Sequence, residues 1–189
     1  IGEKFPKASK ILTKEKATID TFEKEAREYY IVHLSTHGNL CLPIENSNLE
    51  FSSNYRENLT LSKIRQLNSP KGFERTQLVV MSACETAIGS KAIGPDENFA
   101  DYAVIPLSLS QAFESIRVYA IIGTLWKVQD LASKDLMIDF YDKLKANQFK
   151  TVEALSQAKR EYIQYNRKEK SVNVNPYYWA GFILTGDYR

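Results

Sequence analysis

The feature of the sequence that most constrains the fold is a short apolar run that leads directly into small residues and a cysteine. Residues 77–89 read QLVVMSACETAIG, with four apolar residues before Ser82 and a thiol at Cys84. Apolar runs of this length are typical of strands that are buried on both faces of a parallel sheet. Reactive groups gather where such strands end, because the chain leaves the sheet there while its position stays fixed. The run therefore predicts a parallel sheet with Cys84 at the carboxyl end of one strand.

A second apolar run has the same organisation and ends in a histidine. Residues 30–38 read YIVHLSTHG, and His37 lies 47 residues before Cys84. Two neighbouring parallel strands would bring a histidine and a cysteine at this spacing to one edge of a sheet. We therefore interpret Cys84 as a nucleophile and His37 as its general base. The alternative for Cys84 is a buried cysteine that only packs.

Strands and helices alternate along the rest of the chain. Residues 118–125 read VYAIIGTL and predict a third buried strand, and residues 182–185 predict the last one. Thr60 is expected to cap the helix that crosses from the His37 strand to the Cys84 strand, whereas Thr18 or Asp20 and Thr151 are expected to cap two others. The sequence also predicts helices at 18–27, 58–68, 107–115, 131–146 and 152–166, and a hairpin at 39–51. This alternation predicts an α/β domain with a mostly parallel sheet between helical layers.

Four sequence blocks together resemble one known family. They are STHG at 35–38, SACET at 82–86, GTLWKVQD at 123–130 and YWAGFILTGD at 178–187. In this order and spacing they resemble the CHAT family of caspase-like, separase-related cysteine peptidases, which are often fused to tetratricopeptide repeats. The resemblance implies a caspase-like three-layer sandwich with helices on both faces of the sheet. It also implies that residues 1–189 are a single peptidase domain that lacks upstream regions.

The resemblance adds further residues to the expected site. The backbone N–H of Gly38, and that of Cys84, would donate to the oxyanion, although Gly38 could equally be a turn glycine. Trp126 and Asp130 would line the pocket for the substrate residue before the scissile bond, as an acidic residue does for arginine in the related separases. The alternative for Asp130 is the N-cap of the helix that follows.

The composition limits which binding partners and which cellular compartment are expected. Lys and Arg number 25 against 23 Asp and Glu, a net charge of +2, which does not indicate a nucleic-acid surface. The 2 cysteines give no disulfide framework, and no signal peptide or long apolar span is present, so the cytoplasm is expected. A membrane partner is not expected either. Because the first residue is Ile1, we expect an upstream repeat region, pseudo-peptidase region or activating complex to be the partner.

A zinc site is the competing interpretation of the titratable residues. Cys41, Cys84, His33 and His37 are zinc-type ligands, but residues four apart on a strand are about 13 Å apart, too far to share one metal. We therefore expect no metal and no cofactor, and we interpret His33 as a strand histidine and Cys41 as a packing residue.

The function that these residues predict is hydrolysis of peptide bonds in a protein substrate by a His–Cys dyad. The alternative is a catalytically silent, caspase-like scaffold or interaction module, because a fold does not determine an activity. Residues 86–106 contain glycine, proline and acidic side chains directly after the nucleophile. We expect this segment to hold the enzyme latent until a partner orders it.

Overall fold

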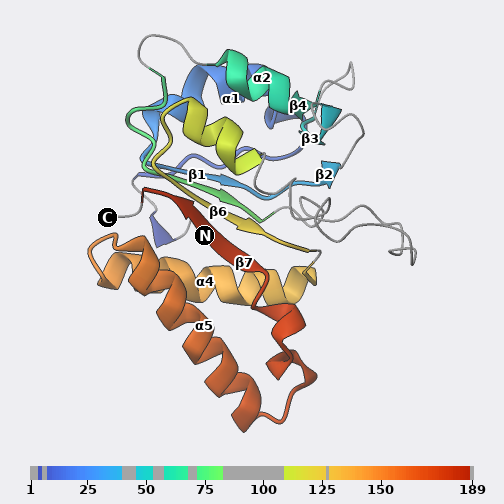
Figure 1. Cartoon of the computed structure of the whole chain (residues 1–189), viewed down its shortest axis with the longest axis vertical. Coiled ribbons are helices and arrows are strands. Elements are labelled where there is room, and N and C mark those ends of the chain that lie inside the picture. Colours follow the sequence, from blue (N-terminus) through green and yellow to red (C-terminus); the bar gives the residue numbers. More distant parts are fainter. Residues whose placement is uncertain are drawn as a thin grey trace. The chain divides into compact units, whose positions relative to one another are not determined.

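The chain contains a four-stranded, mostly parallel sheet. The computed structural model describes residues 4–5, 8–39, 46–52, 58–67, 72–82, 109–126 and 128–187. The strands lie in the order β1 (Ile31–Leu34), β5 (Leu78–Met81), β6 (Ala120–Thr124) and β7 (Phe182–Gly186). β1, β5 and β6 run parallel, whereas β7 runs opposite to β6 (Figure 1). The expected α/β class and the four expected sheet strands are therefore confirmed.

A second, smaller sheet consists of three very short strands. Gly38–Asn39 (β2) pairs antiparallel with Asn48–Leu49 (β3), and β3 pairs antiparallel with Leu59–Thr60 (β4). The pairing of β2 with β3 confirms a hairpin, but the third strand β4 was not expected from the sequence. Cys41 lies in the sequence between β2 and β3, outside the described residues. The segment 86–106 is also outside the described residues.

Helices cover one face of the four-stranded sheet. They are α1 (Ile19–Glu25), α2 (Leu61–Gln66) and a helical segment at 109–115, with short 3-10 turns η2 (Lys14–Lys16) and η3 (Ala26–Glu28) beside α1 (Figure 1). The Thr18 hydroxyl accepts a hydrogen bond from the Thr21 N–H, and the Thr60 hydroxyl accepts one from the Lys63 N–H. Both bonds satisfy N–H groups that the first helical turn leaves without a partner, so the predicted caps at Thr18 and Thr60 are confirmed.

The core on this face joins all three helical segments to the sheet. The side chains of Val79 and Ile121 face each other across β5 and β6, and both are fully buried. Above them the Phe22 ring of α1 lies 6.0 Å from the ring of Phe73. The larger buried side chains of this core include Ile19, Phe22, Leu34, Leu49, Leu61, Ile64, Phe73, Val79, Met81, Leu109, Phe113, Ile116 and Ile121. This continuous apolar contact fixes the strands whose ends carry the predicted site.

Two compact units make up the chain. Residues 13–127 and 183–187 form one unit, which contains both sheets apart from Phe182 of β7, and residues 1–12 and 128–182 form most of the other. The second unit contains α4 (Asp130–Ala146), α5 (Thr151–Lys168), η5 (Val172–Val174) and η6 (Pro176–Tyr178). The prediction of a single peptidase domain over the whole chain stays a prediction.

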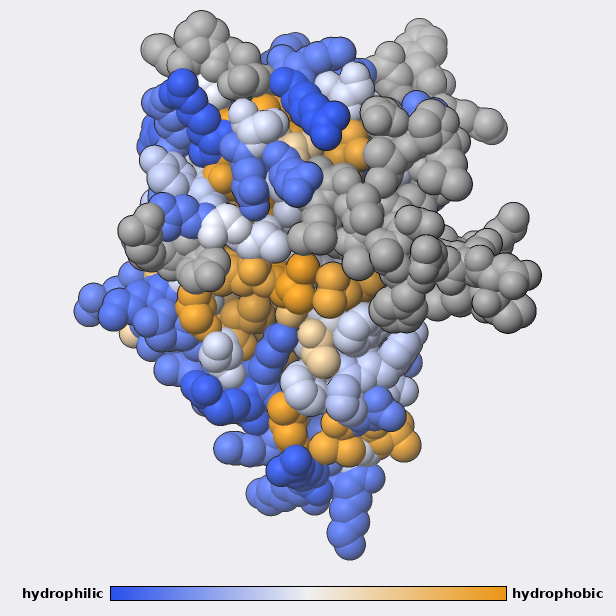
Figure 2. All heavy atoms as spheres, in the orientation of Figure 1, coloured by the Kyte–Doolittle hydropathy of each residue, from blue (hydrophilic) through white to orange (hydrophobic). Residues whose placement is uncertain are grey.

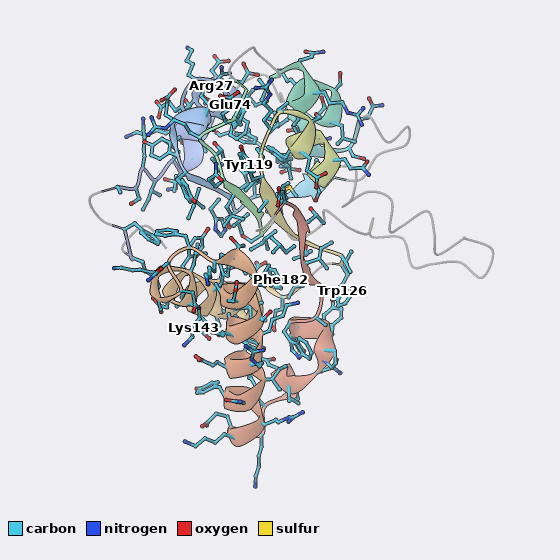
Figure 3. All side chains as sticks on the ribbon, turned by 60° about the vertical axis from the view of Figure 1, so that its left-hand side comes forward. Arg27, Glu74, Tyr119, Trp126, Lys143 and Phe182 are labelled. Carbon is cyan, nitrogen blue, oxygen red and sulfur yellow. The ribbon has the colours of Figure 1, made fainter. Side chains whose placement is uncertain are left out.

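In the second unit, α4 and α5 pack against each other, and each helix has a buried apolar face. The buried residues Leu136, Phe140 and Leu144 recur at helical spacing on α4, as predicted from the sequence. The Lys143 ammonium, labelled in Figure 3, lies 2.6 Å from the Glu161 carboxylate on α5. One expected cap is wrong, because Lys150 occupies the N-cap position of α5 without a side-chain hydrogen bond and Thr151 is the first helical residue.

A close backbone approach explains the glycine at the end of β7. Gly186 has φ of +94°, and a Cβ atom there would lie 2.2 Å from the carbonyl oxygen of Tyr119, directly before β6. Neither the left-handed φ nor this contact is compatible with a larger residue. Gly186 therefore lets the C-terminal strand lie close against the start of β6.

Candidate active site at the strand ends

The pairing of β1 with β5 has a fixed offset that bears on the predicted dyad. Ile31 faces Leu78 and Leu34 faces Met81, so each residue of β1 lies beside the residue 47 positions later in the sequence. The Ser82 N–H donates to the Leu34 carbonyl oxygen at 3.1 Å, which carries the pairing beyond the last strand residue. Both strands therefore end at the same level of the sheet.

His37 follows β1 after two further residues, and its side chain is exposed. Its backbone carbonyl accepts a hydrogen bond from the Glu50 N–H at 2.8 Å. The neighbouring Thr36 hydroxyl donates to the Glu50 carbonyl oxygen at 2.5 Å. These two bonds fix the backbone at His37, while the imidazole is accessible to a molecule that binds there.

Gly38 is a buried strand residue whose N–H points away from its strand partner. It faces Leu49 in the pairing of β2 with β3. The bond from the Glu50 N–H to the His37 carbonyl lies directly outside this pair, and this makes Gly38 and Leu49 a non-hydrogen-bonded pair of the antiparallel ladder. The Gly38 N–H is therefore not donated to β3. The alternative of a simple turn glycine is wrong, since Gly38 lies in β2.

Cys84, the predicted nucleophile, lies outside the described residues. Ser82, two positions earlier, is the last described residue after β5, and its hydroxyl lies 2.6 Å from Nε2 of His33. Burial lowers the pKa of His33 to about 4, so its imidazole is neutral near pH 7. His33 is thus a strand histidine, as expected. Ser82 was not predicted as the partner of His33. It lies 49 residues after His33, which is two more than the offset of 47 between β1 and β5.

Trp126 leaves the third parallel strand on the far side of β5 from β1. Leu78 faces Ala120 and Val80 faces Ile122, so each β5 residue lies beside the residue 42 positions later. Trp126 follows β6 after one residue and is half-buried (Figure 3). Its position 42 residues after Cys84 matches the offset between β5 and β6.

Asp130 is the first residue of α4 and belongs to the other compact unit. Its side chain is exposed. The alternative role as N-cap is wrong, because Gln129 occupies that position and makes no side-chain cap hydrogen bond. A carboxylate in the first turn still interacts favourably with the helix dipole.

Among the described residues, no group of three or more histidine, cysteine or acidic side chains is arranged to hold a metal ion. In the same part of the chain, no helix combines the length and the apolar character that crossing a membrane requires.

Two comparisons with known proteins bear on the site. The family model of the CHAT domain matches residues 1–187, which is nearly the whole chain. A search of curated proteins found no match. The matched range contains His37, Cys84, Trp126 and Asp130, and it spans both compact units.

Proposed function

The chain belongs to the CHAT family, whose fold is caspase-like and related to that of peptidases, and we propose that it is a cysteine endopeptidase. Cys84 is the nucleophile and His37 is its general base. The substrate is a protein. An upstream region or an activating complex is the partner that regulates the peptidase. The cytoplasm is the proposed site of action, because a thiol nucleophile stays reduced there.

The offset between β1 and β5 is the observation that supports this proposal most. It equals the separation of His37 and Cys84, since both are 47 residues. Each of the two residues comes three positions after the last residue of its strand. If both segments continue in register, the two side chains leave neighbouring strands at one level, where backbones are about 4.8 Å apart. A base and a thiol at that separation can share a proton.

The chemistry follows from this pairing. His37 takes the proton of the Cys84 thiol, and the thiolate attacks the carbonyl carbon of the scissile peptide bond. The C–N bond then breaks, and the amine leaves with the proton that His37 returns. In the second half, His37 removes a proton from water, and the resulting hydroxide attacks the thioester. The acid leaves and the thiolate regains its proton.

Gly38 would support the negatively charged oxygen of the intermediate. Its N–H points away from β3 and directly follows the proposed base, so it is suitably placed to donate to an oxyanion. A donor fixed in a strand costs no reorganisation when charge develops on the substrate oxygen.

Removal of either member of the dyad should remove most of the activity. We expect Cys84→Ala to abolish cleavage of an internally quenched peptide library and His37→Ala to lower the rate about a thousandfold or more, because nucleophile and base act as a unit. The free energy of unfolding should change little in His37→Ala, since that side chain is exposed. Cys41→Ala is the matched control and should cleave as the wild type does.

A thiol-reactive peptide probe separates the peptidase from a silent scaffold. The peptidase requires selective labelling of Cys84 over Cys41, and loss of that labelling in His37→Ala. Equal, slow labelling of both cysteines would favour the scaffold. Full proteolysis by Cys84→Ala would remove Cys84 from the mechanism.

Trp126 and Asp130 would form the pocket for the residue before the scissile bond. The position of Trp126 supports this role, because Trp126 comes 42 residues after Cys84 and 42 is also the offset between β5 and β6. An exposed carboxylate at Asp130 would select a cationic substrate residue. We expect Asp130→Asn to lower kcat/KM for arginine at that position about tenfold or more, with little effect on apolar residues. An unchanged preference across a peptide library would exclude this role for Asp130.

A further inference from the structure

A cavity lies within the unit that α4 and α5 form. Its volume is about 540 Å³, and its walls come from α4, α5 and the turn that leads into η5. Three carboxylates line it, those of Asp135 and Asp139 on α4 and that of Glu169 directly after α5. Tyr162 and Tyr165 of α5 line it as well. The cavity therefore combines aromatic rings with a concentrated negative charge.

The three cavity carboxylates form no ion pair, unlike the acidic residues beside them, although Lys143 lies near enough to Asp139 to lower the pKa of that carboxyl. The Glu161 carboxylate pairs with Lys143 at 2.6 Å, and the Asp142 carboxylate pairs with Lys4 at 2.6 Å. Within the described part of the chain, Asp135, Asp139 and Glu169 form no ion pair. Lys143 therefore balances only part of the negative charge of the cavity, and a cationic ligand would balance more of it.

The electrostatic environment of Asp139 favours an additional cation in the cavity. Burial raises the pKa of Asp139, the nearby carboxylates of Glu161, Asp142 and Asp135 raise it further, and the Lys143 ammonium lowers it in part. A positive charge in the cavity would reverse this unfavourable field.

The Tyr162 hydroxyl is an independent sign of a missing ligand. The residue is only 3% exposed and lines the cavity, yet its hydroxyl has no hydrogen-bond partner in the part of the chain that the structure describes. A buried polar atom without a partner costs free energy, and native proteins rarely leave one. A ligand with N–H groups would satisfy this oxygen.

We propose that this cavity binds the arginine side chain of a partner polypeptide. A guanidinium is planar, stacks on aromatic faces and donates several hydrogen bonds to carboxylates, so it matches the tyrosines and the acidic residues together. The described residues offer no set of three metal ligands, and a metal ion would leave the aromatic walls without a function.

The rim of the cavity fits a polypeptide better than a free amino acid. The Tyr165 side chain is 66% exposed, and Val172 of η5, between two lining residues, is 76% exposed. Figure 2 shows apolar side chains gathered around η5. Apolar side chains next to the arginine in a bound chain would cover them, and apolar surface left in water at a binding site is typical of such contacts.

The proposal is tested by titration of the full chain with a blocked peptide that has leucine on each side of one arginine. Amide chemical shifts in NMR spectra report the binding. The same peptide with citrulline, the neutral analogue of arginine, should bind about tenfold more weakly or worse. Blocked arginine without the leucines should also bind more weakly, because it cannot cover the rim.

Substitutions of residues that line the cavity should weaken binding of the arginine peptide. The double variant Asp135→Asn/Asp139→Asn should lose binding of the arginine peptide, and Tyr162→Phe should weaken it several-fold. Asp20→Asn/Glu153→Gln is the matched control: it removes the same number of charges at positions that do not line the cavity, and it should bind as the wild type does.

Three outcomes would overturn the proposal. These are equal affinity for the citrulline and the arginine peptides, full binding by the double variant, and a loss of affinity in the control variant as large as that in the double variant. Glu169→Gln guards against misfolding, because Glu169 is exposed and its replacement should still weaken binding. All titrations are carried out in the Cys84→Ala background, which cannot cleave the peptide, and binding is read from the amides of the residues that line the cavity, so the result is independent of whether the chain cleaves peptides.

Discussion

The buried environment of His33 predicts how the free energy of unfolding depends on pH. It is held in β1 with Nε2 at 2.6 Å from the Ser82 hydroxyl, and burial lowers its pKa from 6.5 to about 4. The unfolded chain therefore binds a proton at His33 at a higher pH than the folded chain does. Between pH 6.5 and pH 4 the free energy of unfolding should fall as pH falls, by at most about 3 kcal/mol from this residue.

Urea denaturation at pH 7 and at pH 5 tests this expectation. His33→Gln cannot titrate, so its stability should depend less on pH than that of the wild type over this interval. Gln66→Asn is the control, because Gln66 is exposed and does not titrate, so its replacement should leave the pH dependence as it is. Equal pH dependence in the wild type and in His33→Gln would contradict the assigned environment of His33.

For individual residues, the sequence predicted where some site residues lie along the strands, but it did not predict which side chains they contact. The spacing of His37 and Cys84 equals the strand offset because both apolar runs begin the same distance before these residues. The bond between His33 and Ser82 could not be predicted in this way. It depends on which face of the sheet each side chain lies on, and that becomes known only with the register.

At the scale of elements, buried strands and long helices were predictable because their patterns are long or strongly apolar. β5 and β6 are buried throughout, and their apolar runs mark them in the sequence. β4 was missed because it has only two residues, which is too short for any periodicity. It exists because Asn48–Leu49 pairs with it, and this long-range contact leaves no local signal.

The helix caps show that the sequence predicts the first residue of a helix only to within about one position. Thr18 and Thr60 have extended backbones directly before their helices, and their hydroxyls accept from the third residue along. Thr151 and Asp130 have equally suitable side chains, but they are the first residues inside their helices. The extended residues there are Lys150 and Gln129, whose side chains do not cap. Composition alone does not fix which residue turns into the helix.

At the scale of the whole molecule, the last strand returns to the sheet that begins at Ile31. Residues 183–187 belong to the unit of residues 13–127, although the intervening residues 128–182 belong to the other unit. Closing such a long excursion costs chain entropy before the β7 contacts form. The sequence indicated the strand itself, but it could not indicate how the chain divides into compact units, because that depends on contacts between distant residues.

Stability should also be distributed unevenly over the unit that contains both sheets. The Ala120 N–H donates to the Gln77 carbonyl at 3.0 Å, and the Glu50 N–H donates to the His37 carbonyl at 2.8 Å. The bond lengths are similar, but the surroundings differ. Ala120 is buried in a strand next to β5, which has partners on both sides, whereas Glu50 follows a strand of two residues.

Native-state hydrogen exchange of the full chain should therefore separate these two amides. We expect Ala120 to exchange only through global unfolding, with the highest protection in the sheet, and Glu50 to exchange through a local opening of β2 and β3 at a lower free energy. Raising the urea concentration should speed exchange at Ala120 with the full denaturant dependence of unfolding, and at Glu50 with a much smaller one. If Glu50 showed the same protection and the same urea dependence as Ala120, the backbone at His37 would belong to the rigid core. A local opening would instead be a rare excursion of β2 and β3, and the folded state would still hold His37 and the N–H of Gly38 in place.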